Sequence, residues 1–167
     1  AALGDTGEID LGRRALDVAR AVPGVQAATL VSVVPFYTSM SAPLFVAGID
    51  SVARLGEFGY QAVRGDYFGT TGTRILRGRR LLPSDGAGTA RVAVVSEAMA
   101  KTLWPGAEAV GKCFRMVAGT APCVAVVGVA ENALQSSLSE TPLEFYLPLE
   151  QYHPSTGHSL LLRTSAS

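Results

Sequence analysis

Residues 106–113 come nearest to a chemical motif in this chain. The segment Gly106-Ala-Glu-Ala-Val-Gly-Lys-Cys113 has the glycines and lysine of a phosphate-binding loop, but Cys113 stands where Ser or Thr would hold Mg²⁺. Such a loop also needs a strand before it and a helix after it, because the helix N-terminus must face the phosphate. Here the sequence predicts a helix before the segment and a β-hairpin after it. We therefore expect no nucleotide binding.

Cys113 and Cys123 bracket a segment with a turn signal at Ala118-Gly119. Apolar or alternating residues flank that turn, which favours a β-hairpin. If the turn centres near Ala118, the cysteines lie opposite each other, where cross-strand Cβ atoms are about 4.5–5.5 Å apart and a modest twist permits a disulfide. We predict this disulfide, and with it a periplasmic or extracellular location. Two buried thiols in a cytosolic protein are the alternative.

Metal ligands are present at an unfavourable spacing. Cys113, Cys123, His153 and His158 could be assembled into a ligand set. A structural zinc site usually places its cysteines about two to four residues apart, and these two are much further apart in the chain. The histidines also lie in a Pro-Ser-Thr-Gly segment that is typical of a solvated surface. We predict no metal.

Residues for catalysis are no better arranged. The chain has no Gly-x-Ser-x-Gly nucleophile elbow, and we expect Ser96 to cap a helix. Asp66, Asp85 and Glu131 stand singly in predicted loops, where carboxylates usually form turns. We predict that the chain is not an enzyme and holds no cofactor.

Arg77, Arg79 and Arg80 form the one basic cluster of the sequence. Guanidinium groups at this spacing could hold a phosphate or carboxylate, which makes them candidate anion contacts. A solvated edge with salt bridges is the alternative, and we favour it.

Composition excludes several classes of protein. The chain has 167 residues, of which 48% are hydrophobic and 17% charged, so it is not globally disordered. Lys plus Arg and Asp plus Glu both number 14, and a net charge of zero disfavours nucleic-acid or anionic-membrane binding. No run reaches the roughly 18 apolar residues of a membrane span. Because it starts Ala-Ala-Leu, we expect the chain to be a piece of a longer protein.

Around these residues the sequence predicts an α+β domain with mixed, strand-rich sheets and two or three short helices. The expected helices are 11–22, with Asp10 as N-cap and Pro23-Gly24 as stop, a short turn at 66–68 broken by Gly69 and Gly72, and 97–103. A surface turn is expected at 86–89. The expected strands are 25–34, 44–49, 58–64, 75–76, 92–95, the cysteine hairpin continued through 124–129, 145–147 and 160–162.

The loop at 35–43 has unusual apolar content for a loop. Exposed aromatic residues and Met often mark interfaces, so Phe36, Tyr37 and Met40 are candidate partner contacts. Folding of these side chains back into the core is the alternative.

Several short motifs occur in an order and spacing that resemble one family. The motifs are Val22-Pro23-Gly24-Val25, residues 63–72, 76–79, 91–100, 103–106, 110–112, 126–129 and 146–149, and Leu162-Arg163-Thr164. Their order resembles the MacB-like periplasmic core domain of ABC transporter permeases, in the MacB/FtsX superfamily, from about Leu11 to Thr164. By position, the resemblance implies a core anchor at Tyr67-Phe68 and structural roles for Trp104-Pro105-Gly106 and Gly111-Lys112.

The resemblance implies a non-catalytic domain outside the cytoplasmic membrane, between the first two transmembrane helices of a permease. It implies a porter-like βαβ part, here residues 1–50 completed by 158–167 and by residues beyond the chain, and an inserted Sabre-like part, here residues 51–157. Its implied role is to pass ATP-driven movement to cargo or partners. The implied partners are a second permease protomer, a cytoplasmic ATPase and a periplasmic adaptor protein. A free-standing secreted anion-binding domain or small hydrolase is the alternative.

Overall fold

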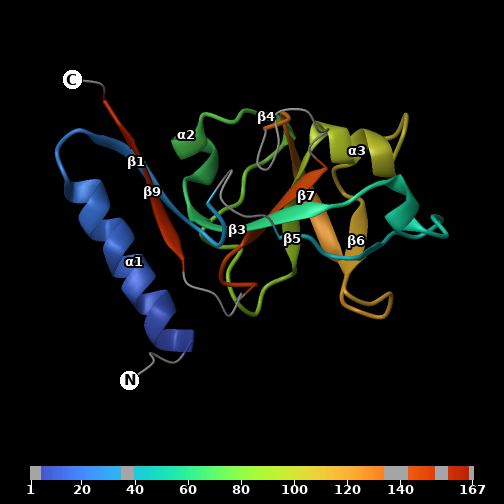
Figure 1. Ribbon diagram of the computed structural model, residues 1–167, viewed down its shortest axis with the longest axis horizontal. Helices are drawn as coiled ribbons and strands as arrows, with labels where there is room; N and C mark the ends of the chain where they lie inside the picture. The colour runs from blue at the N-terminus through green and yellow to red at the C-terminus, as the bar shows by residue number, and fades with distance from the viewer. Residues whose placement is uncertain (1–4, 35–39, 134–142, 153–157, 166–167) are drawn as a thin grey trace.

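Nine strands form one mixed sheet in the computed structural model, which describes residues 5–34, 40–133, 143–152 and 158–165. The strand order is β2-β6-β7-β5-β8-β3-β1-β9, and β4 pairs with β7 beside this path. The pairs β3–β8 and β5–β7 are parallel, and the other described ladders are antiparallel. Helix α1 lies beside β1 and β9 at one end of the molecule, and β6 and α3 lie towards the other end (Figure 1).

The strands are β1 (Val25–Val31), β2 (Leu44–Phe45), β3 (Gly59–Gly65), β4 (Ile75–Gly78), β5 (Val92–Ser96), β6 (Cys113–Met116), β7 (Val124–Ala130), β8 (Glu144–Pro148) and β9 (Ser159–Thr164). The helices are α1 (Asp5–Ala21), α2 (Tyr67–Thr71) and α3 (Glu97–Leu103), with a 3-10 turn at Val52–Leu55. Among the described residues, none of these helices is both long and apolar enough to cross a membrane.

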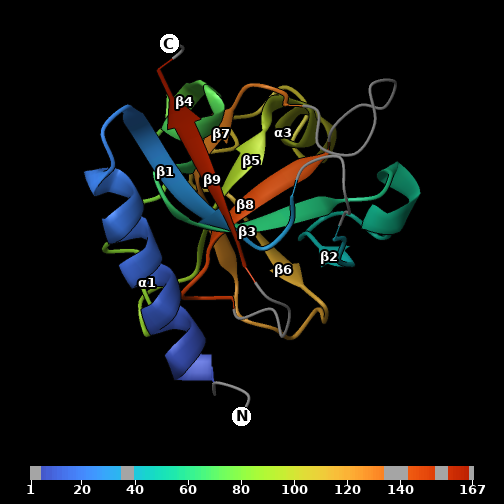
Figure 2. The ribbon, with the colours of Figure 1, turned by 60° about the vertical axis from the view of Figure 1, so that its left-hand side comes forward.

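One face of the sheet carries α1, which packs on β1 (Figure 2). Leu16 and Ala19 are three residues apart, so they share one side of the helix and reach the sheet together. They form an apolar cluster with residues of β1 and β3 and with the residue that follows β8, namely Ala28, Leu30, Ala62 and Leu149. Burial of these side chains fixes α1 against the strands.

A larger apolar cluster holds α3 against the other end of the sheet. Met99 is fully buried there, and Phe114 and Phe145 meet edge to face with their ring centroids 5.0 Å apart. The opposite face of the sheet carries α2, whose Tyr67 and Phe68 both contact Tyr146 of β8. Tyr67 and Phe68 are therefore core anchors, as expected.

Helix α1 begins earlier than the sequence predicts. Asp10 was expected at the N-cap but lies inside the helix, where its carboxylate accepts a hydrogen bond from the Arg13 guanidinium at 2.7 Å. An acidic residue can stand either at a helix N-terminus or three residues before a cation on the helix surface, and here it takes the second position.

Two further boundaries differ from the expectation. Gly69 was expected to break the helix but lies within α2, where its N–H donates to the carboxylate of the N-cap Asp66. The Asp66 carboxylate occupies the space that a Cβ on residue 69 would need. Gly72, in the left-handed conformation, ends the helix. Strand β2 covers only the first two residues of the expected 44–49, since the chain turns at Gly48, which has φ +84°. The strands expected at 58–64, 92–95, 145–147 and 160–162 are confirmed, as is the turn at 86–89.

Ser96 joins α3 to the sheet. Its Oγ accepts hydrogen bonds from Met99 N, as the predicted N-cap, and from Glu144 N, both at 3.1 Å. The residue is fully buried, so water does not replace these bonds.

We predict that Ser96→Ala lowers the free energy of unfolding by about 2 kcal/mol, because it leaves buried N–H donors without their acceptor. Urea denaturation measures the change. Ser84→Ala, at an exposed turn, is the matched control and should shift stability by less than about 0.5 kcal/mol. Equal effects of the two variants would contradict this role.

Candidate functional site

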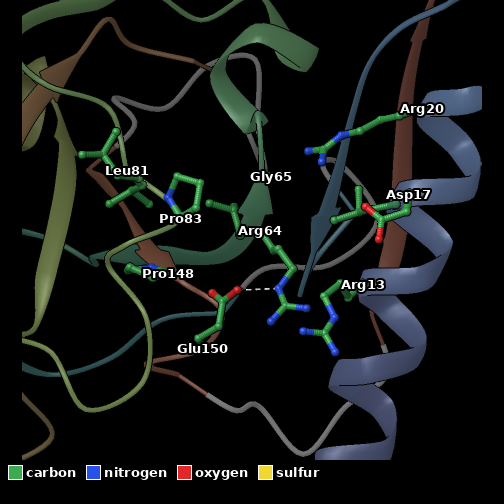
Figure 3. Close-up of a pocket in the computed structure, with 12 residues that line it drawn as sticks. Arg13, Asp17, Arg20, Arg64, Gly65, Leu81, Pro83, Pro148 and Glu150 are labelled. Carbon is green, nitrogen blue, oxygen red and sulfur yellow. Dashed lines mark hydrogen bonds and ion pairs between the residues drawn. The ribbon is translucent and has the colours of Figure 1, made fainter.

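A cleft of about 380 Å³ lies between α1 and the ends of β3 and β8 (Figure 3). Arg13, Asp17 and Arg20 of α1 line one wall. The other wall consists of Arg64 of β3, Glu150 after β8, and apolar residues of the loop that follows β4. These apolar residues are Leu81, Leu82 and Pro83, together with Pro148.

The charged wall follows from helix periodicity. Residues 13, 17 and 20 are four and three positions apart, so their side chains share one side of α1 and point toward the sheet (Figure 3). Arg20 Nη2 lies 2.9 Å from the position that a Cβ on Gly65 would occupy. Gly65 has φ +88°, so it both turns the chain and leaves room for this guanidinium.

An ion pair connects β3 to the segment after β8 inside the cleft. Arg64 Nε donates to Glu150 Oε1 at 2.5 Å, and their side chains are 14% and 28% exposed. Because both charges are shielded from water, their attraction is screened less than that of a surface pair. The pair fixes the position of one cation and one anion at the cleft wall.

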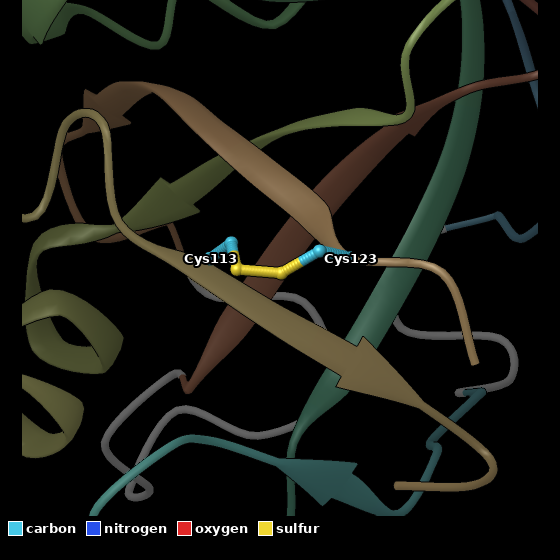
Figure 4. Close-up of a disulfide and its surroundings, with 2 residues drawn as sticks. All are labelled: Cys113 and Cys123. Atoms are coloured by element: carbon cyan, nitrogen blue, oxygen red, sulfur yellow. A yellow bond between two sulfur atoms is a disulfide. The ribbon is translucent and has the colours of Figure 1, made fainter. Parts of the chain in front are cut away.

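A disulfide closes the hairpin of β6 and β7 (Figure 4). Cys113 and Cys123 are bonded with their Cα atoms 5.8 Å apart, which confirms the predicted pairing. The predicted register is wrong, however, because Cys113 lies opposite Ala125 and Cys123 precedes β7. The displacement arises at the turn, where Val117 adopts a positive φ and Ala121 N donates to Ala118 O.

The hairpin tip exposes apolar side chains. Val117 is 70% exposed and has φ +68°, a conformation that β-branched residues rarely adopt. Phe45 is 42% exposed and lies on Gly119 of the turn. Strand β2 pairs with β6, and Val117 N donates to Pro43 O. We call Phe45 and Val117 the hairpin patch.

Of the three predicted contact residues, the structure describes Met40. Met40 is half-buried and its carbonyl accepts a hydrogen bond from Tyr60 N. Phe36 and Tyr37 lie outside the described residues. Partner contact through Phe36, Tyr37 and Met40 stays a prediction.

Each arginine of the basic cluster faces a carboxylate. Arg79 Nη1 and Nη2 donate to the two oxygens of Asp85 at 2.7 and 2.9 Å, and this bond raises the pKa of Arg79. Burial raises the pKa of Asp85, but hydrogen bonds from Arg79 and Leu82 N outweigh it and lower that pKa overall. Arg77 pairs with Glu108 at 3.6 Å and Arg80 with Asp66 at 3.2 Å. Anion contact at this cluster stays a prediction.

A buried acid that no sequence signal predicts lies at the start of β8. Glu144 is only 9% exposed, and its carboxyl group occupies the space beside Gly59 on the paired strand β3. Burial, and to a smaller extent the negative charge of Glu57, raises the pKa of Glu144 to about 7. Only the parallel register of β3 and β8 places the glycine beside the acid, so spacing along the chain could not reveal it.

No group of three or more His, Cys, Asp or Glu side chains in the described ranges is arranged to hold a metal ion. Of the ligand set considered above, both cysteines are engaged in the disulfide and His153 lies outside the described residues. Residues 106–113 follow α3 and lead into β6, which is the helix-before, hairpin-after order expected from the sequence.

The fold is similar to those of solved domains from transporters and a permease, two of which are periplasmic or extracellular. The periplasmic region of MacB from Actinobacillus actinomycetemcomitans has a TM-score of 0.65 and 18% identity, over 93% of this chain and 65% of that one. The extracellular domain of the ABC-type transporter YknZ from Gram-positive bacteria has a TM-score of 0.64 and 17% identity, over 93% and 74%. A domain of a permease protein from Porphyromonas gingivalis has a TM-score of 0.58 and 16% identity, over 90% of this chain and 60% of that one. No curated protein matches the chain.

These likenesses define an α+β domain of the kind found in the extracytoplasmic regions of membrane transporters, and they confirm the predicted fold class. The chain belongs to the family of MacB-like periplasmic core domains, whose family model matches residues 4–166. The predicted resemblance and the extracytoplasmic location are thereby confirmed. The chain spans about 65% of the length of the MacB periplasmic region.

We predict that replacing both cysteines, Cys113→Ser with Cys123→Ser, lowers the free energy of unfolding by up to about 3 kcal/mol. A crosslink with a sequence separation of 10 restricts the unfolded chain by that order. Denaturation with and without dithiothreitol measures it. The reductant should lower the midpoint of the native chain and leave that of the double variant unchanged; an unchanged native midpoint would contradict the prediction.

We predict that stability falls as pH rises from about 4.5 to about 7. The pKa of Glu144 is raised from its ordinary 4.5 to about 7 in the folded chain. In this window the folded chain keeps a proton that the unfolded chain has lost, so deprotonation favours unfolding, by roughly 2–3 kcal/mol in total. Urea denaturation across pH 4–8 measures the slope.

Glu144→Gln is the matched variant for this prediction, since it keeps the shape and removes the titration. Its stability should be nearly independent of pH in that window and should exceed that of the native chain at pH 8. Glu97→Gln, on the surface of α3 in an i,i+4 pair with Lys101, is the control. A slope that survives Glu144→Gln would assign the pH dependence to another group.

Proposed function

We propose that this domain is the extracytoplasmic part of an ABC transporter permease and that it transmits ATP-driven movement to cargo or partner proteins outside the membrane. ATP hydrolysis belongs to a separate cytoplasmic ATPase subunit or domain, which acts through membrane helices. A second permease protomer and a periplasmic adaptor protein are the proposed partners. Membership of the MacB-like family supports this role.

The observation that carries the proposal is the continuity of the sheet. Hydrogen-bonded ladders run without a break in strand order from β9 and β1 to β6 and β2. Helix α1 and strand β9, the first and last elements described, lie away from the hairpin of β6 (Figure 1). A sheet that is packed on both faces resists bending, so movement applied at one end displaces the other.

The hairpin patch is the proposed contact for a partner protein. Exposed apolar residues cost free energy in water, and they are enriched at the centres of interfaces. The disulfide and the pairing of β2 with β6 hold Phe45 and Val117 in place, so a partner need not order them on binding.

We further propose the two-part division expected from the sequence, with a porter-like part of residues 1–50 and 158–167 and a Sabre-like part of residues 51–157. The pairing of β1 with β9 and the packing of α1 on β1 support the first grouping. The free-standing anion-binding alternative has less support, because an anion at Arg79 would compete with the Asp85 carboxylate, which already accepts two hydrogen bonds from that guanidinium.

Electron spin resonance on the full-length permease with its ATPase tests the transmission. Arg14→Cys on α1 and Lys101→Cys on α3 place spin labels at exposed positions at opposite ends, and the native cysteines are bonded. We expect the distance between the two labels of one protomer to stay constant on addition of ATP and vanadate. The distance between the Lys101 positions of two protomers should change.

A doubly labelled protomer diluted with unlabelled protomer isolates the first distance, and an ATPase-inactive variant is the control for the second. A constant distance between protomers would overturn the transmission role. A changing distance within one protomer would show that the domain is not a rigid body.

A further inference from the structure

The cleft between α1 and the sheet has the size and lining of a small-molecule site. Its volume of about 380 Å³ falls within the usual range of ligand pockets, roughly 300–1,000 Å³. Leu16 and Val63 are each 3% exposed and contribute buried apolar surface to its lining. Leu82 at the other wall is 42% exposed, which leaves an apolar side chain in water that a ligand could cover.

Two of the three arginines that line the cleft are in ion pairs within the described residues. Arg13 pairs with Asp10 outside the cleft, and Arg64 pairs with Glu150. In the described part of the chain, no ion pair includes Arg20. Asp17 lines the same wall as Arg20. Asp66 lines a second, smaller pocket together with Arg20, and its carboxylate pairs with Arg80.

Arg20 is exposed, and one nitrogen of its guanidinium lies close to Gly65 at the end of β3. The missing Cβ of Gly65 lets its guanidinium lie against the end of β3, where Figure 3 shows it reaching from α1 toward the strands. A guanidinium beside apolar walls can pair with the acidic group of a ligand whose apolar part covers those walls.

We propose that this cleft binds an anionic amphiphile, namely a phosphate or carboxylate carried on a short apolar chain. The acidic group pairs with the Arg20 guanidinium, and the apolar chain lies on Leu16, Leu82 and Pro83. The cleft belongs to the 167-residue chain, so this binding does not depend on ATP-driven movement and is tested without the permease.

Calorimetric titration of the chain with octyl phosphate tests the proposal. We expect saturable binding of one molecule per chain, at least tenfold tighter than that of 1-octanol, which lacks the charge, or inorganic phosphate, which lacks the apolar chain. Arg20→Gln should weaken octyl phosphate about tenfold and leave 1-octanol unchanged. Arg14→Gln, the same change on the same helix away from the cleft, should have no effect.

Leu82→Ser provides a second variant at an exposed position. It should weaken the binding of both octyl phosphate and 1-octanol while leaving the far-ultraviolet circular dichroism unchanged.

Co-sedimentation with phosphatidylcholine vesicles that contain phosphatidic acid separates the two sources of such a ligand. Sedimentation of the chain indicates a membrane lipid, and its absence, with octyl phosphate bound, indicates a free amphiphile. Equal affinity for octyl phosphate and 1-octanol, or no effect of Arg20→Gln, would overturn the proposal.

Discussion

The parallel pairing of β3 with β8 is the link on which the described sheet depends. On one side of it lie β5, β7, β6, β4 and β2, and on the other β1 and β9. All residues of β8 are buried, and successive side chains reach opposite faces, so Phe145 and Leu147 join one apolar cluster and Tyr146 joins another. Strand β8 therefore joins its neighbours β5 and β3 by hydrogen bonds and also packs into the apolar clusters on both faces of the sheet.

The same strand positions the polar groups at its two ends. At its start, Glu144 lies buried beside Gly59 and its amide binds Ser96, which connects a titrating carboxyl group to the N-terminus of α3. Just after its end, Glu150 binds Arg64 in the wall of the cleft. The surroundings of the Glu144 carboxyl group and the position of the Arg64–Glu150 pair therefore both depend on the pairing of β3 with β8.

The cleft and the hairpin patch lie at different places on this sheet and have different physical character. The cleft combines apolar walls with guanidinium groups, which suits a small amphiphilic anion. The hairpin patch is uncharged, exposed and closed by a disulfide, which suits contact with a protein surface. A rigid sheet between them would keep their relative position while the domain moves as a unit.

Local order in the chain was sufficient to predict several elements. The Ser96 cap, the end of α3 at Trp104, the hairpin and the Cys113–Cys123 bond all follow from residues within about a dozen positions of one another. The start of α1, the length of β2 and the hairpin register differ from the expectation, because a local side-chain pair or turn competes there with the predicted element. The tertiary structure had to show which of the competing local arrangements the chain adopts. It alone decided the cleft, since Arg64 and Glu150 are 86 residues apart and meet through the register of parallel strands, which no spacing in the sequence specifies.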